Sequence, residues 1–133
     1  MSTINGWPHF RPVHNASFSR QLRNANISQP AGLTNPHGHH IVMKGAFSLW
    51  NDSARRSVRY AQAILQQHNI DIHGIGENVH WGPMSIAGNG IHTQRYAREV
   101  AMRLQLVRKG SRQNVLNMLQ QIASELQSGT FPI

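Results

Sequence analysis

Three stretches of the chain space their apolar residues as amphipathic helices do. The first begins at Asn51, a candidate N-cap, and runs to about His68; the second runs from His92 to about Val107, and the third covers about residues 112–127. Apolar residues recur three or four positions apart in each, which places them on one helix face. The predicted core positions are Ala54, Val58, Ala61, Ile64 and Leu65, then Tyr96, Val100, Leu104 and Val107, then Val115, Leu119, Ile122 and Leu126.

Two short runs between turn residues predict strands. One begins at Ile41-Val42 and reaches Met43, and the other covers residues 77–81 before Gly82-Pro83. Short β-branched or aromatic runs bounded by Gly and Pro are typical of strands. Strands interspersed among longer helices predict an α+β fold that is mostly helical.

The first 36 residues show no sustained helical or strand period and carry four prolines. We therefore expect an extended, loop-rich arm over residues 1–36 and a folded domain over residues 37–133. The arm is too apolar to be fully solvated, so part of it should pack on the domain or on a partner. Its apolar side chains are Trp7, Phe10, Val13 and Phe18.

A histidine doublet, His39-His40, lies between Gly38 and the first predicted strand. Neighbouring strand residues point to opposite faces, so the two rings are badly placed to hold one ion side by side. A division of labour fits better, in which one histidine binds a metal and the other faces a substrate as a base. The alternative is that both histidines are solvent-facing loop residues with no role in metal binding or catalysis.

Composition narrows the class of partner. The 133 residues suit one domain, and 13 Lys+Arg against 5 Asp+Glu give a net charge of +8. All the basic residues except Lys44 and Lys109 are arginines, whose planar fork suits phosphate. The charge favours a polyanion as partner, although a merely soluble basic surface is the alternative. No cysteine is present, which excludes disulfides and thiolate metal sites, and no apolar run is long enough for membrane insertion.

Four segments of the chain follow one another in an order that resembles one nuclease superfamily. In chain order, these segments are Gly38-His39-His40-Ile41-Val42, residues 61–65 through 69–72, Glu77-Asn78-Val79-His80-Trp81-Gly82-Pro83, and Gly90-Ile91-His92-Thr93 with Tyr96. This order is similar to that of the HNH, or endonuclease VII-like, nucleases of bacterial polymorphic toxins with AHH or GHH signatures. The resemblance spans about residues 36–107 and implies a ββα-metal core.

The resemblance implies a role for each matching residue. His39 and His92 would bind one divalent metal, and His40 would be the general base that activates water. Asn78 would orient that base or tighten the site, and Tyr96 would contact metal-bound water or phosphate. The run Glu77-Asn78-Val79 departs from the Asn-Gly of many relatives, which leaves the register of the asparagine open. His37, His73 and His80 have no assigned role, and any of them could replace a named ligand.

These roles predict a metal-dependent endonuclease that hydrolyses DNA. A neutral histidine can activate water, and one metal ion can stabilise the phosphate charge and the leaving oxygen. Mg²⁺ is our first choice, with Mn²⁺, Ni²⁺ or Zn²⁺ as alternatives. The predicted nucleic-acid contacts are Lys44, Arg55, Arg59, Arg95 and Arg98. The alternatives are an RNase of the same fold and a non-catalytic basic binding module with a structural histidine metal site.

A toxic nuclease must be restrained in the cell that makes it. We therefore expect a cognate acidic immunity protein that binds the basic surface. The arm of residues 1–36 could join the domain to a delivery protein or a larger parent toxin. The toxin-like signature implies export or delivery into a target bacterial cell and action in its cytoplasm.

Overall fold

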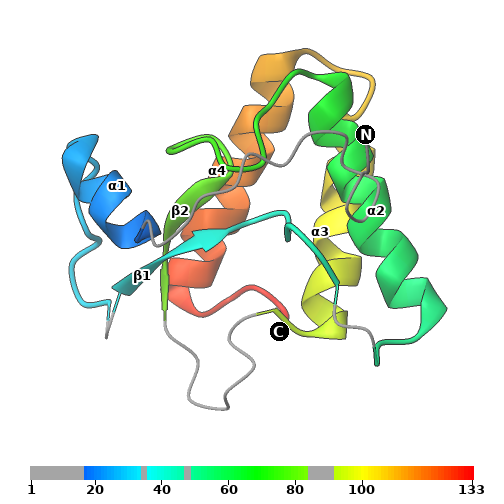
Figure 1. Ribbon diagram of the computed structural model, residues 1–133, viewed down its shortest axis with the longest axis horizontal. Coiled ribbons are helices and arrows are strands. Elements are labelled where there is room, and N and C mark those ends of the chain that lie inside the picture. The colour runs from blue at the N-terminus through cyan, green and yellow to red at the C-terminus, as the bar shows by residue number, and fades with distance from the viewer. Residues whose placement is uncertain (1–16, 34–35, 47–48, 84–91) are drawn as a thin grey trace.

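The computed structural model describes residues 17–33, 36–46, 49–83 and 92–133. Within these ranges the chain forms four helices and one two-stranded antiparallel sheet, which confirms the α+β class (Figure 1). The elements in order are α1 (Phe18–Asn24), β1 (Pro36–His40), α2 (Asp52–Gln67), β2 (Val79–Pro83), α3 (Gln94–Val107) and α4 (Arg112–Ser128).

Each long helix begins at a polar cap whose side chain accepts a backbone N–H of the first turn. Asn51 caps α2, as predicted; Thr93 caps α3, and Ser111 forms a capping box with Asn114 at α4. The predicted core stripes are buried, apart from Val107, which is partly buried. The apolar period therefore located these helices correctly.

Helices α2 and α3 lie side by side and run in the same direction (Figure 1). Near their beginnings, Arg98 donates to the Asn51 side chain at 3.3 Å. At their ends, the His68 ring donates to the Arg108 carbonyl at 2.9 Å. Helix α4 packs on α3 and β2, so the three helices and the segment after β1 enclose one apolar core.

Both predicted strands are displaced along the chain. β1 ends at His40, before the predicted Ile41–Met43, and β2 begins at Val79 instead of residue 77. The buried segment after β1 bonds differently: Ile41 N donates to the Asn78 carbonyl at 2.8 Å, and Val42 N donates to the Asn78 side chain at 2.8 Å. A side chain replaces the neighbouring strand here, which the apolar pattern alone does not reveal. The doublet therefore lies at the end of a strand and not at its entry.

The prediction of a loop-rich arm is wrong for residues 18–24, which form α1. This helix buries Leu22 against Val79 and Trp81, and Phe18 packs beside them. Seven residues span about two turns, too few for a helical period to stand out from the sequence. The predictions for Trp7, Phe10 and Val13 lie outside the described residues.

Gly38 allows α1 to lie directly on β1. A Cβ atom at this position would lie 2.7 Å from the carbonyl carbon of Phe18 and 2.9 Å from the backbone nitrogen of Ser19. The Ser19 hydroxyl accepts the Gly38 N–H at 3.0 Å. The glycine before the histidine doublet thus has a packing reason, which is close contact with the start of α1.

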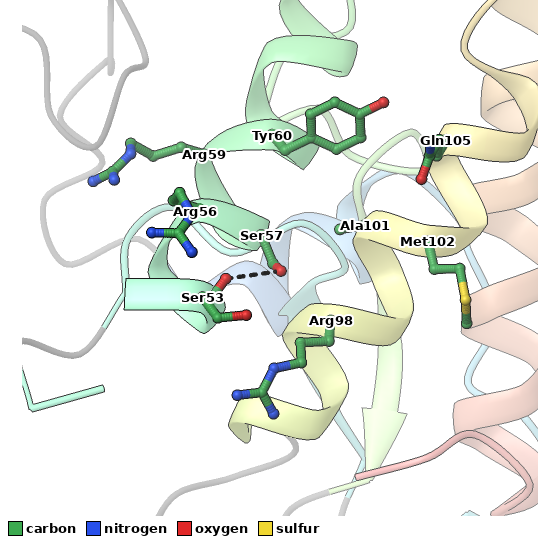
Figure 2. A pocket seen from close by; sticks show the side chains of 9 residues that line it. All are labelled: Ser53, Arg56, Ser57, Arg59, Tyr60, Arg98, Ala101, Met102 and Gln105. Carbon is green, nitrogen blue, oxygen red and sulfur yellow. Dashed lines mark hydrogen bonds between the residues drawn. The ribbon is translucent and has the colours of Figure 1, made fainter. Parts of the chain in front are cut away.

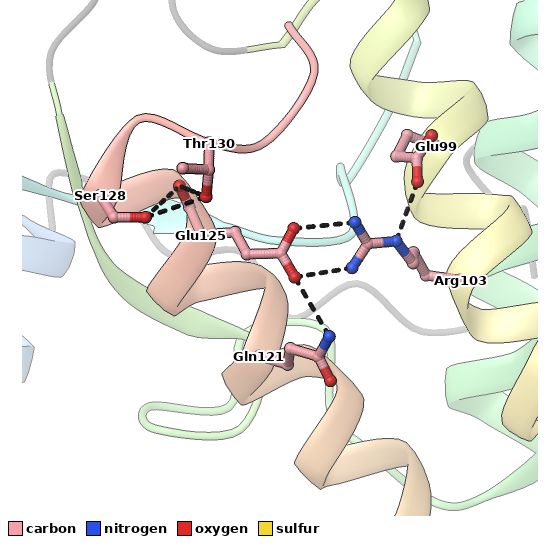
Figure 3. A network of polar contacts seen from close by, with 6 residues as sticks. All are labelled: Glu99, Arg103, Gln121, Glu125, Ser128 and Thr130. Atoms are coloured by element: carbon pink, nitrogen blue, oxygen red, sulfur yellow. Dashed lines mark hydrogen bonds and ion pairs between the residues drawn. The ribbon is translucent and has the colours of Figure 1, made fainter.

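A charged network joins α3 to α4 (Figure 3). Arg103 donates to both oxygens of Glu125 at 2.8 Å and to Glu99 at 2.8 Å. Its guanidinium also lies 5.3 Å from the centre of the Phe131 ring. The bonds from Arg103 lower the pKa of Glu125 to about 2, with a smaller contribution from Gln121. The network therefore stabilises the packing of α4 on α3.

This network makes the stability of the fold depend on acidity. Because the pKa of Glu125 is lower in the folded state, its stabilising effect is complete above the ordinary value of 4.5 and is lost as the pH falls toward about 2. We expect Glu125→Gln to lower the free energy of unfolding at neutral pH by about 1–3 kcal/mol. Urea titrations of both proteins at several pH values measure this difference. If the difference in the free energy of unfolding between the two proteins stays constant as the pH falls toward about 2, the ionised Glu125 carboxylate is not its source.

Candidate functional site

The sheet separates the two histidines of the doublet. His40 lies on the face covered by α1, where its ring centre is 4.5 Å from that of Phe18. His39 lies on the other face, directly opposite His80 in the strand register. The predicted placement of the two rings on opposite faces is therefore confirmed.

Two other imidazole rings lie near His39. Its ring centre lies 6.2 Å from that of His92 and 6.3 Å from that of His37. Gly82 makes room for it, since a Cβ there would lie 2.9 Å from His39 Cδ2. Burial, with smaller contributions from His92 and His37, lowers the pKa of His39 to about 4, so the ring is neutral near pH 7. Its Nε2 is buried and has no hydrogen-bond partner within the part of the chain that the structure describes.

His92 lies two residues before the first residue of α3. The predicted helix start at His92 is therefore wrong, and Thr93 is the N-cap. The ring still lies against Tyr96, with the ring centres 5.2 Å apart. His92 Nε2 lies 2.9 Å from the His40 carbonyl oxygen. A carbonyl oxygen only accepts, so Nε2 carries the proton and Nδ1 keeps a lone pair. Burial lowers the pKa of His92, which keeps the ring neutral.

The same reasoning assigns the nitrogens of His39. The Pro83 backbone raises the pKa of His39 against the effect of burial, and Nε2 has no partner among the described residues, which favours Nδ1 as the protonated nitrogen. His92 thus gives its N–H to a backbone carbonyl, and His39 keeps an Nε2 without a partner among the described residues. Metal-binding histidines are commonly oriented in this way.

The structure brings the two predicted metal ligands together without a third. Among the described residues, no three His, Asp or Glu side chains lie close enough to hold a metal ion. His80, opposite His39 in the ladder, donates its Nε2 proton to the Glu77 carbonyl at 2.9 Å. A metal held by His39 and His92 would complete its coordination with water or substrate.

His40 lies in a different environment from the one that its predicted role implies. The residue is 7% exposed, and its Nε2 lies 2.9 Å from Nδ1 of His73. Burial is the largest cause that lowers the pKa of His40 to about 3, followed by His73 and Lys44. The ring is neutral but is a weak proton acceptor in this conformation. The sequence does not predict this partnership, because His73 is 33 residues from His40 and no spacing signal links the two.

Asn78 is completely buried and braces the backbone. Its side chain accepts from Val42 N at 2.8 Å, donates to the Val42 carbonyl at 3.0 Å and donates to the Ile72 carbonyl at 2.9 Å. These bonds tie the segment after β1 to the turn before β2. Asn78 therefore holds the backbone after the doublet in place, and none of these bonds goes to the His40 ring.

Tyr96 is also enclosed by the core. Its side chain has no exposed surface, and its hydroxyl donates to the Ile41 carbonyl. Burial raises its pKa well above the ordinary value of 10.0. In this conformation the hydroxyl holds the chain just after the doublet and does not reach a substrate.

Only two of the five predicted nucleic-acid contacts lie on the same groove. Arg59 and Arg98 line one groove between α2 and α3, together with Arg56 (Figure 2). Lys44 and Arg95 are exposed and Arg55 is half-buried, but they do not line this groove.

Neither a family model nor a curated protein nor a solved structure matches the chain. Within the described residues, no helix has both the length and the apolar character needed to cross a bilayer.

Proposed function

We propose that this chain is a metal-dependent endonuclease of the HNH or endonuclease VII type, with a ββα-metal core formed by β1, β2 and α3. The observation that carries the proposal is the buried, unpartnered Nε2 of His39, which lies beside the oriented ring of His92. A bare imidazole nitrogen without a protein partner is expected where a metal ligand belongs. The +8 charge supports DNA as the substrate, and RNA would be served by the same residues.

His39 Nε2 and His92 Nδ1 would hold the ion. The metal would supply charge neutralisation at the phosphate and at the leaving oxygen. No carboxylate accompanies the two imidazoles among the described residues. Imidazole donors suit Zn²⁺ or Ni²⁺ better than Mg²⁺ or Mn²⁺, which moves our preference away from Mg²⁺.

His40 would act as the general base. It would take a proton from water as the water oxygen bonds to phosphorus and the bond to the 3′ oxygen breaks. Asn78 and Tyr96 would act on this step indirectly, because both bind the backbone that follows the doublet. They are positioning residues in this proposal.

One observation favours a second candidate function. The 7% exposure of His40 and its bond to His73 suit a structural residue, and hence a non-catalytic basic module with a histidine metal site. Supercoiled plasmid incubated with the protein, with each metal in turn and with EDTA, separates the two functions. Nicking that requires a metal supports the nuclease, whereas intact plasmid with every metal would refute the DNase proposal, and an RNA substrate then tests the RNase.

The variant His40→Ala tests the base directly. We expect cleavage to fall by about 100-fold or more, because general-base catalysis contributes about 10²–10⁴-fold. Circular dichroism and metal content should stay unchanged. Loss of the fold would instead support the structural module, and cleavage at the wild-type rate would remove His40 from the mechanism.

The partners follow from the nuclease proposal. An acidic immunity protein would protect the producing cell, and a delivery protein or parent toxin would carry the domain into the cytoplasm of a target bacterium. Expression of the active domain with and without its neighbouring gene tests this expectation. We expect growth only when an acidic protein is co-expressed; healthy cells that hold active nuclease alone would refute it.

A further inference from the structure

A groove of about 750 Å³ lies between α2 and α3 (Figure 2). We call it the α2–α3 groove. Its volume is within the range of about 300–1,000 Å³ typical of ligand sites. The lining residues are Ser53, Arg56, Ser57, Arg59 and Tyr60 from α2, and Arg98, Ala101, Met102 and Gln105 from α3.

The groove is strongly basic. Arg56, Arg59 and Arg98 line it, and no acidic side chain does. Among the described residues, the ion pairs of arginine belong to Arg103 and Arg112 and not to these three. Three guanidinium groups without a carboxylate partner favour an anionic ligand, and their planar forks suit phosphate oxygens.

Apolar and aromatic groups accompany the charges. Tyr60 is 38% exposed and Met102 is 52% exposed, and the buried Ala101 also lines the groove. Figure 2 shows Tyr60 extending from α2 toward Gln105 of α3. An exposed aromatic ring beside arginines can stack a nucleobase while the arginines bind the phosphates.

We infer that the α2–α3 groove binds a single-stranded segment of nucleic acid. In a duplex the faces of the bases are stacked on each other and cannot reach the Tyr60 ring. An acidic peptide would satisfy the arginines, but its carboxylates would bring no planar group to that ring. The inference rests on the proposed function in taking a nucleic acid as the ligand, and it adds a preference for unpaired strands.

Helix α3 connects the groove with the chain segment that carries His92. α3 begins two residues after His92, and Arg98 lies about 6 Å along the helix from its first residue. Arg98 is two positions beyond Tyr96, which the His92 ring contacts, so the two side chains lie on different faces of α3.

Binding is measured by fluorescence anisotropy in EDTA, so that cleavage cannot interfere. The probes are a labelled DNA strand of about 12 nucleotides, its duplex, and poly-glutamate as competitor. We expect tighter binding of the single strand. The double variant Arg56→Gln/Arg59→Gln should bind it at least about 10-fold more weakly and show a shallower salt dependence.

Tyr60→Ala should weaken binding of the single strand about 5- to 100-fold, whereas Tyr60→Phe, which keeps the ring, should bind as the wild type does. Arg20→Gln is the matched control, since it removes one exposed arginine from α1, and it should have little effect. Circular dichroism verifies the fold of each variant.

Equal affinity for duplex and single strand, or no loss in Tyr60→Ala, would overturn the inference. Displacement of DNA by poly-glutamate at similar concentration would point instead to an acidic protein. Metal-dependent cleavage is measured separately. If the groove variants weaken binding but the wild type cleaves no DNA, only the proposed nuclease function is refuted. Cleavage with unaffected groove variants would refute the groove alone.

Discussion

His39→Ala is expected to abolish metal-dependent cleavage while leaving the metal-free fold intact. Among the described residues His39 Nε2 has no hydrogen-bond partner, so its removal breaks no such bond of that nitrogen. The loss falls on the metal, and we expect its affinity to decrease at least about 100-fold. Titration calorimetry with Ni²⁺ or Zn²⁺ measures this change. Thermal unfolding gives a second readout, since a bound ligand at 100 times its Kd stabilises the wild type by about 2.7 kcal/mol.

His68→Gln is the matched control for this experiment. It also removes a half-buried histidine, but one that bonds to the Arg108 carbonyl at the far end of α2. We expect unchanged metal affinity, with some loss of stability from the missing bond. If His39→Ala binds metal as tightly as the wild type, the site is wrongly assigned. If both variants lose metal equally, the effect is general and not specific to the site.

Asn78→Ala is expected to cause the largest loss of stability. The side chain satisfies three buried backbone groups, namely the N–H and the carbonyl of Val42 and the carbonyl of Ile72. Each buried polar group left without a partner costs about 1–3 kcal/mol. We expect the free energy of unfolding to fall by about 3–5 kcal/mol, measured by urea titration.

Two further variants test whether the loss of stability comes from the hydrogen bonds of the Asn78 side chain. Asn78→Asp keeps the acceptor but loses both donated bonds, so it should also destabilise the fold. Asn117→Ala removes an exposed asparagine of α4, and it should change the free energy of unfolding by less than about 0.5 kcal/mol. A small effect of Asn78→Ala would show that the segment after β1 does not depend on this side chain.

The fold was predictable where one periodic signal extends over several turns. α2 and α4 combine a polar N-cap with an apolar stripe, and both formed close to the predicted bounds. α1 has only Leu22 fully buried and gave no period. The strands were displaced because their ends depend on cross-chain bonds, such as those of Asn78, that no local pattern records.

The candidate site was predictable only in part. Strand alternation correctly separated His39 from His40, and the structure brings His39 close to His92. The partnership of His40 with His73, and the enclosure of Tyr96, were not foreseen. Both depend on which distant surface covers a side chain.

The sequence by itself determined the three long helices, the basic charge and the placement of the two histidines on opposite faces, because periodicity, composition and strand geometry are local properties. Only the tertiary structure decided which nitrogens keep a lone pair, how deeply His40 is buried and which arginines share a groove. These properties depend on burial and on contacts between residues distant in the chain. The bare nitrogen of His39 beside His92 is one such property, and the proposed function rests on it.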